Sequence, residues 1–443
     1  MRITVIGTGY LGAVHAVCMA QAGHEVLGLD LDAAKIDALS SGRAPFFEPG
    51  LPELLAEGLA SGRLAFTTDP AEAAAFGEVH FLCVGTPQQP GSNAADLRYL
   101  HAAVESLAPH LHRPCLVVGK STVPVGTAAA LAAKLAELAP VGAEAELAWN
   151  PEFLREGFAV EDTLRPDRLV VGVTGEHAEA VLREVYAPVL ALGTPWISTD
   201  LATAELVKTA ANSFLATKIS FINAMAEICD ATGADVTTLA DAIGHDARIG
   251  RRFLDAGLGF GGGCLPKDIR AFHARAQELG VGSALDFLGH VDTINLRQRT
   301  RTVDAARELL GGGFAGRQVT VLGVTFKPDS DDIRDSPSLH VARMIAAEGA
   351  EVRVHDPEGL ANAKSAHPEL ECVDSVEDAC AGADLLLHLT PWRQYRELDP
   401  AEVATWVRAP RLLDGRNALD ASRWAAAGWT LRLLGKPAPS PVG

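Results

Sequence analysis

The chain has 443 residues, of which 48% are hydrophobic and 21% are charged, a composition typical of globular proteins. At roughly 150 residues per domain, this length predicts about three domains. The net charge of −18 argues against nucleic acid or an anionic membrane surface as the main partner, because both bind a basic face. A small anionic ligand is compatible with this charge, since a few local cations and helix N-termini can bind phosphate.

The seven cysteines are widely spread and show no C-x-x-C spacing, so neither a disulfide framework nor a zinc site is indicated. The first apolar run, residues 3–6, is typical of a strand rather than of a signal peptide. No uncharged apolar stretch reaches the roughly 18–20 residues that span a bilayer. We therefore predict a cytoplasmic protein with reduced cysteines, no metal site and no membrane insertion.

Short apolar runs alternate with alanine-rich helical stretches over the first half of the chain. The runs at residues 2–7 and 23–30 predict strands on either side of a glycine turn and a helix. Further strands are predicted at residues 79–85, 115–120, 146–149 and 169–173. This alternation predicts a parallel sheet with helices on both faces.

The pattern changes near residue 200. Residues 201–231 and 283–310 predict two long helices, and no strand pattern returns before residue 317. Beyond the glycine-rich stretch 311–316, residues 318–323 and 349–356 echo the first two strands, as a weak internal repeat. We therefore predict an α/β fold of two Rossmann-like lobes with parallel sheets, joined by a central helical domain that contains a long connecting helix.

The motif Gly7-Thr-Gly9-Tyr-Leu-Gly12 follows the first strand and opens a helix. In such a fingerprint Gly7 permits a tight turn, Gly9 lets a pyrophosphate approach the backbone, and Gly12 lets the helix pack on the strand. Asp30 ends the next strand, where its charge would bind ribose hydroxyls and repel the extra phosphate of NADP. Lys35 belongs near the same ribose or is a solvated helix lysine. The residues predicted to bind NAD here are Gly7, Gly9, Tyr10, Leu11, Gly12, Asp30 and Lys35.

The corresponding turn of the second lobe, Gly323-Val-Thr-Phe-Lys327, lacks the glycines of the fingerprint, so we do not expect a second NAD there. Instead a polar cluster follows the strand, at the edge where parallel sheets bind ligands. Its members are Lys327, Asp331, Asp332 and Arg334. Lys327 is a candidate phosphate ligand; the alternative is a solvated charged loop.

Residues 257–268 read Gly-Leu-Gly-Phe-Gly-Gly-Gly-Cys-Leu-Pro-Lys-Asp. So many glycines suit a loop whose backbone closes around a ligand. The loop ends in Cys264, and the nearby Lys267 and backbone N–H groups favour the nucleophilic thiolate. We predict that Cys264 is a nucleophile and that the other six cysteines, in apolar contexts, are structural.

Lys208 and Asn212 are four residues apart on the first long helix and so share a face. Together they could stabilise an oxyanion or form an exposed polar stripe. Further polar residues follow predicted strands, among them Thr86, Thr122 and the run Asn150-Pro-Glu152-Phe-Leu-Arg-Glu156-Gly. The two glutamates are candidates for a base, a water ligand or a cofactor contact, although a single glutamate is more often a surface residue.

These motifs, from Gly7 to Arg416, resemble the UDP-glucose/GDP-mannose dehydrogenase family. The most specific are Gly259-Phe-Gly-Gly-Gly-Cys-Leu-Pro-Lys-Asp268, the run that begins at Asn150, and Phe326-Lys-Pro-Asp-Ser-Asp-Asp-Ile-Arg334. Residues 211–223 resemble the UDP-glucose branch more than the GDP-mannose branch. The resemblance implies a four-electron oxidation of the C6 alcohol of UDP-glucose to a carboxylate, with one NAD site used twice.

By the same resemblance, Cys264 attacks the C6 aldehyde to give a thiohemiacetal, which a second hydride transfer converts to a thioester that water hydrolyses. The implied catalytic residues are Cys264, Lys208, Asn212, Asp268, Thr122 and Glu152. The implied cofactor contacts outside the fingerprint are Thr86, Thr122, Glu156, Lys267 and Arg334. The implied substrate contacts are Glu152, Phe153, Leu154, Arg155, Lys208, Asn212, Arg248, Phe260, Gly261, Lys327 and Arg416. Arg248 matches a position that reaches the sugar across a dimer interface, so we expect a homodimer.

The pattern of elements divides the chain into a Rossmann domain at 1–199, a central helical domain at 200–312, a C-terminal Rossmann-like domain at 313–435 and a disordered tail at 436–443. The resemblance implies that the first domain binds NAD and the third binds the nucleotide sugar. Some relatives have serine before the nucleophile where this chain has Gly263, and we expect a small effect. Two alternatives remain: a dehydrogenase of another nucleotide sugar, such as a UDP-N-acetyl sugar or GDP-mannose, and a non-catalytic nucleotide-binding regulatory protein. The presence of Cys264 and Lys208 argues against the latter.

Overall fold

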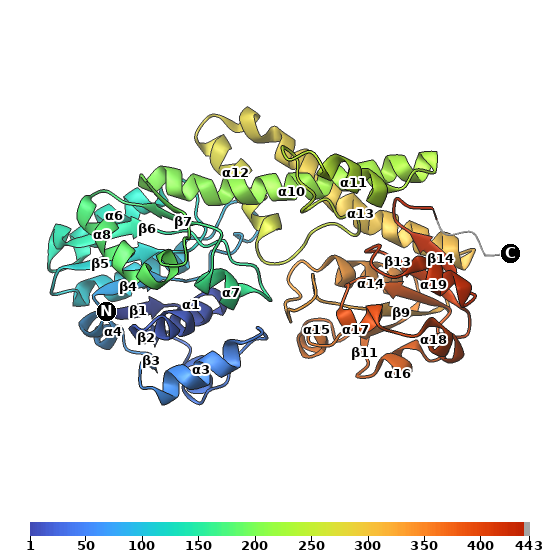
Figure 1. The fold of residues 1–443 in the computed structure, drawn as a ribbon, viewed down its shortest axis with the longest axis horizontal. Coiled ribbons are helices and arrows are strands. Elements are labelled where there is room, and N and C mark those ends of the chain that lie inside the picture. Colours follow the sequence, from blue (N-terminus) through green and yellow to red (C-terminus); the bar gives the residue numbers. More distant parts are fainter. Residues whose placement is uncertain (438–443) are drawn as a thin grey trace. The chain divides into compact units, whose positions relative to one another are not determined.

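The computed structural model describes residues 1–437 and forms two compact units, each with a mainly parallel sheet flanked by helices (Figure 1). Unit 1 contains residues 1–211 and 274–282, and unit 2 contains residues 212–273 and those from 283 onward. Of the predicted tail 436–443, only residues 436 and 437 are among those described. The predicted domain boundaries stay predictions.

Unit 1 is built on an eight-stranded sheet of order β3-β2-β1-β4-β5-β6-β7-β8. Neighbouring strands are parallel except β6 and β7, which are antiparallel. The chain order reverses beside β1, which is flanked by β2 and β4, and ligands of such sheets bind at this switch point. The strands are β1 (Arg2–Ile6), β2 (Glu25–Leu29), β3 (Leu64–Thr67), β4 (Val79–Leu82), β5 (Cys115–Gly119), β6 (Ala145–Trp149), β7 (Leu169–Gly172) and β8 (Trp196–Thr199).

Helices cover both faces of this sheet because its strands send alternate apolar side chains to opposite sides. In β5, for example, Leu116 and Val118 join one core while Cys115 and Val117 join the other. The helices are α1 (Tyr10–Gln21), α2 (Ala33–Ser40), α3 (Leu51–Ala60), α4 (Pro70–Phe76), α5 (Arg98–Leu107), α6 (Thr127–Leu138), α7 (Ala159–Leu164), α8 (Glu176–Val185) and α9 (Ala187–Leu190).

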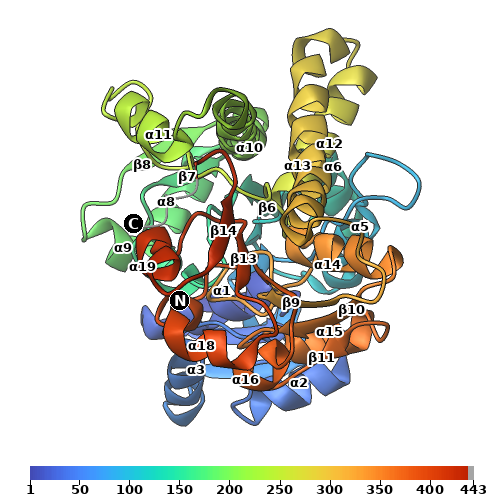
Figure 2. The ribbon, with the colours of Figure 1, turned by 90° about the vertical axis from the view of Figure 1, so that its right-hand side faces the viewer.

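Unit 2 is built on a six-stranded sheet of order β11-β10-β9-β12-β13-β14, in which all neighbours are parallel. One face packs on the helices at 286–310, 337–347 and 360–366, and the other on the helices between residues 376 and 426 (Figure 2). The strands are β9 (Gln318–Leu322), β10 (Glu351–His355), β11 (Glu371–Cys372), β12 (Leu385–His388), β13 (Arg411–Asp414) and β14 (Thr430–Leu433). The helices of this sheet are α14 (Pro337–Ala347), α15 (Leu360–Ala366), α16 (Val376–Cys380), α17 (Arg393–Arg396), α18 (Pro400–Trp406) and α19 (Ala421–Ala426).

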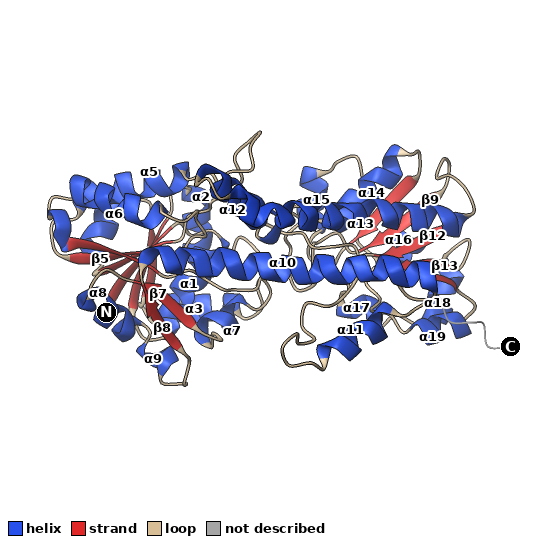
Figure 3. Cartoon of the chain, turned by 90° about the horizontal axis from the view of Figure 1, so that it is seen from above, coloured by secondary structure: helices blue, strands red, loops and turns tan. Residues whose placement is uncertain are grey.

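Four further helices fill the middle of the sequence (Figure 3): α10 (Leu201–Thr232), α11 (Val236–Gly244), α12 (Leu265–Glu278) and α13 (Asp286–Leu310). The predicted fold class is confirmed, including the two Rossmann-like sheets and the long helix α10. The second long helix begins at Asp286 rather than at residue 283, because Gly282–Leu285 form a 3-10 turn.

The six strands predicted in unit 1 are confirmed, whereas β3 and β8 were not predicted. Both have four residues. In β3 only Leu64 and Thr67 are buried, and in β8 no residue is buried, so neither strand has the continuous buried apolar run of the predicted strands. Within residues 1–437, no helix combines the length and the apolarity needed to cross a bilayer. The same residues contain no group of three or more His, Cys, Asp or Glu side chains that could hold a metal ion.

Candidate active site

The predicted fingerprint forms the turn between β1 and α1 in unit 1. Gly7 has a φ of 88°, and a Cβ on Gly12 would lie 1.8 Å from the carbonyl oxygen of Gly7. Gly9 precedes α1 and makes no side-chain cap, and the position of its missing Cβ has no atom within 4 Å. The turn therefore leaves open space before helical N–H groups, which fits the pyrophosphate of NAD.

Asp30 follows β2 beside this turn, as predicted. Its Oδ2 accepts hydrogen bonds from Thr8 N at 2.8 Å and Lys35 Nζ at 2.7 Å, and its Oδ1 accepts one from Asp32 N at 3.1 Å. Burial alone would raise the pKa of Asp30, but these donors outweigh burial and lower it. The carboxylate is thus held ionised, with capacity left on Oδ1 and 13% of the side chain exposed.

Asp356 in unit 2 directly follows β10 at the position that matches Asp30, yet its environment differs. The residue is only 1% exposed, and both of its oxygens are saturated. The donors to Oδ2 are Val324 N, Thr325 N, Thr325 Oγ1 and Trp392 Nε1, and the donors to Oδ1 are Glu358 N and Gly359 N. A ribose would find no acceptor there, which agrees with the missing glycines of this turn.

The run from Asn150 to Gly157 forms a loop in unit 1 between β6 and α7, and we call residues 150–157 the substrate segment. Glu152 Oε1 pairs with Lys208 Nζ at 3.0 Å, and Glu152 Oε2 accepts from Leu154 N at 2.5 Å. The side chain of Glu152 is 12% exposed and that of Lys208 5%. The structure therefore brings together two of the predicted catalytic residues within unit 1.

Other predicted residues of unit 1 lie on neighbouring loops. Thr86 is buried and donates its hydroxyl hydrogen to the carbonyl oxygen of Thr122 at 2.7 Å. The Arg155 guanidinium pairs with Asp162 at 2.6 Å, and Glu156 is half-buried. Of these strand-end loops, the ones that carry Thr86 and Thr122 are thus joined by a hydrogen bond.

A buried lysine that sequence reasoning passed over anchors the start of the substrate segment. Lys120 Nζ donates to Asn150 Oδ1 at 2.9 Å and to the Tyr186 hydroxyl at 3.3 Å, while Asn150 Nδ2 donates to Val170 O at 2.8 Å. Burial lowers the pKa of Lys120 to about 8. The one indication in the sequence was a lysine directly after a buried strand. Its partners could not be predicted, because they lie far away in the sequence.

In unit 2, Cys264 lies directly before α12, and its carbonyl oxygen accepts the helical hydrogen bond from Asp268 N at 3.0 Å. It is the only cysteine of the described residues that is exposed. By contrast, burial raises the pKa of Cys18, Cys83 and Cys380 to about 12. A thiol at the N-terminus of a fourteen-residue helix is in the environment that favours a thiolate.

Three further predicted residues of unit 2 contact one another. Asn212 Nδ2 donates to Asp268 Oδ2 at 2.6 Å, and Lys267 Nζ donates to Asp268 Oδ1 at 2.5 Å. Asp268 is 3% exposed, so these donors hold a buried carboxylate one helical turn after Cys264. A carboxylate at this place can orient a water molecule near the thiol or accept a proton from it.

The glycines of the loop that precedes Cys264 lie very close to other parts of the chain, which the sequence did not reveal. A Cβ on Gly259 would lie 2.3 Å from Asn295 Oδ1, one on Gly261 2.3 Å from Asp335 O, and one on Gly262 2.8 Å from the Phe326 ring. The buried Asn295 also accepts from Phe260 N at 2.7 Å and donates to Phe260 O at 3.0 Å. The chain itself therefore fills the space beside these glycines.

Gly263 is also explained by its neighbours. A Cβ at this position would lie 2.5 Å from the guanidinium carbon of Arg334. Arg334 additionally accepts a hydrogen bond from Gly262 N at its carbonyl oxygen, at 3.0 Å, and pairs with Asp332 at 2.7 Å. The absence of serine at residue 263 thus matches the close approach of a cation to the residue before Cys264.

Arg416 joins the glycine loop to the segment after β9. Its Nε donates to Leu389 O at 2.7 Å, and its terminal nitrogens donate to Gly259 O at 3.2 Å and Phe326 O at 3.4 Å. Burial lowers the pKa of Arg416 to about 10, a value at which it stays charged at neutral pH. These carbonyl partners carry no charge, so the cation remains suited to a phosphate.

Strained backbone lies next to three of the predicted ligand-binding residues. Asp329, Asp335 and Asn417 have φ values of 61°, 45° and 52°, and they lie beside Lys327, Arg334 and Arg416 in the sequence. Residues other than glycine rarely adopt this conformation, and such strain clusters at ligand sites. Lys327 itself lies 5.4 Å from the centre of the Phe326 ring.

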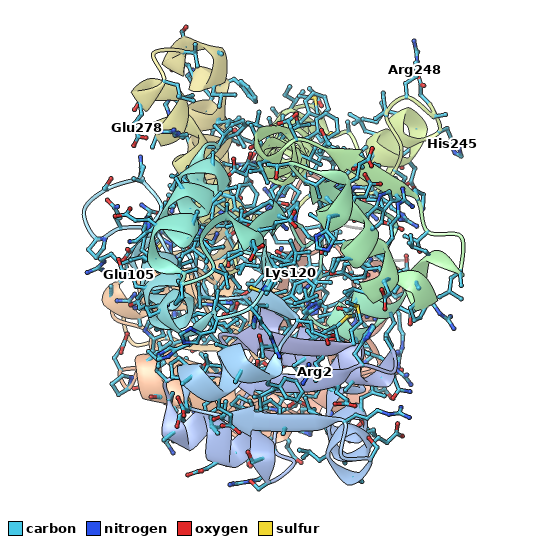
Figure 4. The ribbon with its side chains drawn as sticks, turned by 90° about the vertical axis from the view of Figure 1, so that its left-hand side faces the viewer. Arg2, Glu105, Lys120, His245, Arg248 and Glu278 are labelled. Carbon is cyan, nitrogen blue, oxygen red and sulfur yellow. The ribbon has the colours of Figure 1, made fainter. Side chains whose placement is uncertain are left out.

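Arg248 is not brought to any of these groups within unit 2. It pairs with Asp246 at 2.6 Å on the loop after α11, with 89% of its side chain exposed. Figure 4 shows its side chain pointing outward from that loop.

The family models for UDP-glucose/GDP-mannose dehydrogenases match most of the chain. The NAD binding domain matches residues 1–190, the central domain residues 202–297 and the UDP binding domain residues 320–421. The chain belongs to the UDP-glucose/GDP-mannose dehydrogenase family. The turn at Gly7 and the Cys264 loop are thus parts of one family architecture.

Individual members of this family are similar over their full length. The UDP-glucose 6-dehydrogenase of Rhizobium meliloti is 43% identical over 99% of this chain and 100% of its own length. The UDP-glucose 6-dehydrogenase TuaD of Bacillus subtilis is 39% identical over 99% of this chain and 94% of its own.

Solved structures of family members have the same fold. The UDP-glucose dehydrogenase of Pyrobaculum islandicum is 40% identical and superposes with a TM-score of 0.88, over 96% of each chain. A UDP-D-ManNAc dehydrogenase of Pyrococcus horikoshii is 27% identical, with a TM-score of 0.86 over 98% of this chain and 99% of its own.

We expect the buried Lys120 to make stability pH-dependent. Since its pKa falls from the usual 10.5 to about 8 on folding, the unfolded chain holds an extra proton between these values. The titration of Lys120 therefore increases the free energy of unfolding as pH rises from about 8 to 10.5. The increase is lost again as pH falls through the same range.

This contribution is measured as the difference between the wild type and Lys120→Met in urea unfolding across that pH range. The difference should grow with pH in favour of the wild type. Lys134→Met on α6, where the lysine side chain is 30% exposed, serves as the control for the loss of a lysine that is not fully buried. A constant difference for Lys120→Met would contradict the low pKa.

Proposed function

We propose that this protein is an NAD-dependent UDP-glucose 6-dehydrogenase that converts the C6 alcohol of UDP-glucose to the carboxylate of UDP-glucuronate. The observation that carries the proposal is the exposed Cys264 before α12, one turn from the Asn212–Asp268–Lys267 cluster. The similarity to UDP-glucose 6-dehydrogenases at about 40% identity extends over the whole of each chain. It favours UDP-glucose among nucleotide sugars.

The overall reaction consumes UDP-glucose, two NAD⁺ and water and yields UDP-glucuronate, two NADH and three protons. NAD⁺ supplies the hydride acceptor for each oxidation. After the first, the Cys264 sulfur bonds to the C6 aldehyde and the carbonyl oxygen takes a proton, giving a thiohemiacetal. Loss of a second hydride and of that proton gives a thioester, and water then replaces the sulfur at C6.

Lys208 and Asn212 are proposed to stabilise the oxyanions formed at C6, since an ammonium group and an amide donor favour developing negative charge. Asp268 is proposed to orient or activate the hydrolytic water, with Thr122 and Glu152 in the same network. The ion pair between Glu152 and Lys208 supports this assignment, because it brings two of these residues within 3.0 Å of each other in a buried position.

The nucleotide sugar is proposed to be bound by backbone and cations. Its contacts are Glu152, Phe153, Leu154, Arg155, Lys208, Asn212, Phe260, Gly261, Lys327 and Arg416, with Arg248 from the partner of a homodimer. Arg416 suits a diphosphate because it is positively charged and its guanidinium donates only to uncharged carbonyl oxygens. NAD is proposed to meet the fingerprint residues together with Lys35, Thr86, Thr122, Glu156, Lys267 and Arg334.

A second candidate is a dehydrogenase of another nucleotide sugar. The UDP-D-ManNAc dehydrogenase of Pyrococcus horikoshii favours this candidate. It has the same fold, with a TM-score of 0.86, and its name gives a different nucleotide sugar. A cytoplasmic location is also proposed, because the proposed role of Cys264 needs a free thiol and the cytosol keeps thiols reduced.

The decisive assay counts NADH. We expect the purified protein to form two NADH for each UDP-glucose consumed, because the aldehyde stays bound to Cys264 between the two hydride transfers. The count is read from absorbance at limiting UDP-glucose, with UDP-N-acetyl sugars and GDP-mannose compared at equal concentration. Turnover confined to an N-acetyl sugar would reject UDP-glucose as the substrate.

Cys264→Ser should reduce acid formation by at least a thousandfold, because a hydroxyl is a far weaker nucleophile than a thiolate at neutral pH. Acid formation is followed by chromatography of the nucleotide sugars. Cys372→Ser, at the half-buried cysteine of β11, is the matched control and should keep wild-type turnover. Equal turnover of Cys264→Ser and wild type would refute the covalent role.

A homodimer is proposed on an apolar stripe of α10 within unit 2. Phe214, Phe221 and Ile228 recur every seven residues and are 66%, 49% and 55% exposed, an arrangement that suits a helix partner. We expect light scattering to give about twice the chain mass of 46.5 kDa, and Phe221→Glu to give the single mass. A wild-type chain that stays single at micromolar concentration would refute the dimer.

A further inference from the structure

We propose that Glu48 is a positioning residue, which holds the end of the substrate segment in place for the reaction. Glu48 lies between α2 and α3, where neither a motif nor a strand end marked it. The inference rests on the proposed function, because it concerns the loop that carries Glu152. It assigns a role to a carboxylate that touches neither reactant.

Glu48 is 2% exposed, and its two oxygens bind different parts of the chain. Its Oε2 accepts from Gly157 N at 2.7 Å and from the Tyr10 hydroxyl. Its Oε1 accepts from Ala159 N at 2.7 Å and Val160 N at 3.4 Å. A single carboxylate therefore joins the last residue of the substrate segment to a residue of the NAD turn.

The donors to Glu48 depend on it. The helix α7 has no side-chain cap at its preceding residue, Phe158, so Glu48 supplies the acceptor for the first N–H groups of the helix. Burial, followed by the hydrogen bond to Glu48, raises the pKa of Tyr10, so its hydroxyl remains a protonated donor. Loss of the carboxylate would take this acceptor from the Tyr10 hydroxyl and Ala159 N, and would leave Gly157 N with only the Tyr10 hydroxyl oxygen at 3.1 Å.

The substrate segment has no regular secondary structure from residue 150 to 155, so its shape depends on its two ends. Its first residue, Asn150, is fixed by Lys120 and Tyr186, and its last residue, Gly157, is fixed by Glu48. Between these anchors Glu152 reaches Lys208 at 3.0 Å. Release of one end would let Glu152 move away from the lysine that it pairs with.

Glu48→Gln tests this role because it keeps the shape of the side chain. Whichever way the amide is oriented, one backbone N–H then faces an NH₂ group instead of an oxygen. We expect kcat with UDP-glucose to fall at least tenfold while the Kd for NADH changes less than threefold. The exposed Glu53 on α3 is the matched control, and Glu53→Gln should keep the wild-type kcat.

Two further measurements separate positioning from a general loss of structure. Amide hydrogen exchange of residues 157–160 should accelerate at least tenfold in Glu48→Gln, while the amides of β6 exchange as in the wild type. In a double-mutant cycle, Glu48→Gln should cost less in kcat when Glu152→Gln is already present, since it acts through the same loop. Additive losses, or an unchanged kcat in folded Glu48→Gln, would overturn the proposal.

If Glu48→Gln does not fold, Tyr10→Phe carries the test. It removes the hydroxyl that donates to Glu48 and that also accepts from Gly157 N at 3.1 Å. We expect a twofold to fivefold fall in kcat with faster exchange at Ala159, whose N–H donates to Glu48. No change in either would overturn the proposal. Failure of the proposed function is distinguishable, because wild-type protein would then form no NADH from UDP-glucose, while the exchange measurement would still report on Glu48.

Discussion

The carboxylate of Asp356 accepts hydrogen bonds at both oxygens from its own lobe, whereas that of Asp30 keeps capacity on Oδ1 beside an open glycine turn. This contrast favours a single dinucleotide site of the Rossmann type among residues 1–437. A four-electron oxidation needs two hydride acceptors, so one site must exchange its cofactor during the reaction. The aldehyde must then be retained by the protein, which is the role proposed for Cys264.

The loops that carry the chemistry are held by buried polar side chains rather than by regular structure. Lys120 and Glu48 bind the two ends of the substrate segment. Glu205, on α10 one turn before Lys208, accepts from Gly126 N at 2.7 Å and Ala128 N at 2.6 Å and so holds the loop that follows Thr122. Each such group costs desolvation, which its hydrogen bonds offset only if the loop keeps its shape.

Much of the fold and part of the site could be predicted from the sequence, because both depend on local patterns. Continuous apolar runs marked the buried strands, and the spacing of Gly7, Gly9 and Gly12 marked the cofactor turn. The pairing of Asn212 with Asp268 was not predictable in detail, since the two are 56 residues apart in the sequence. Glu48 and Asn295 escaped notice for the same reason: their roles are set by backbone groups that only the folded chain brings near.

The internal repeat shows the limit of sequence patterns most clearly. It correctly marked Asp30 and Asp356 as residues at equivalent strand ends, but only the structure revealed that the second is saturated. The most direct test of a single site is an equilibrium titration of the protein with NADH in the absence of nucleotide sugar. We expect one NADH per chain, with binding lost in Asp30→Ala. Two NADH per chain, or one that persists in Asp30→Ala, would contradict a single site at Asp30.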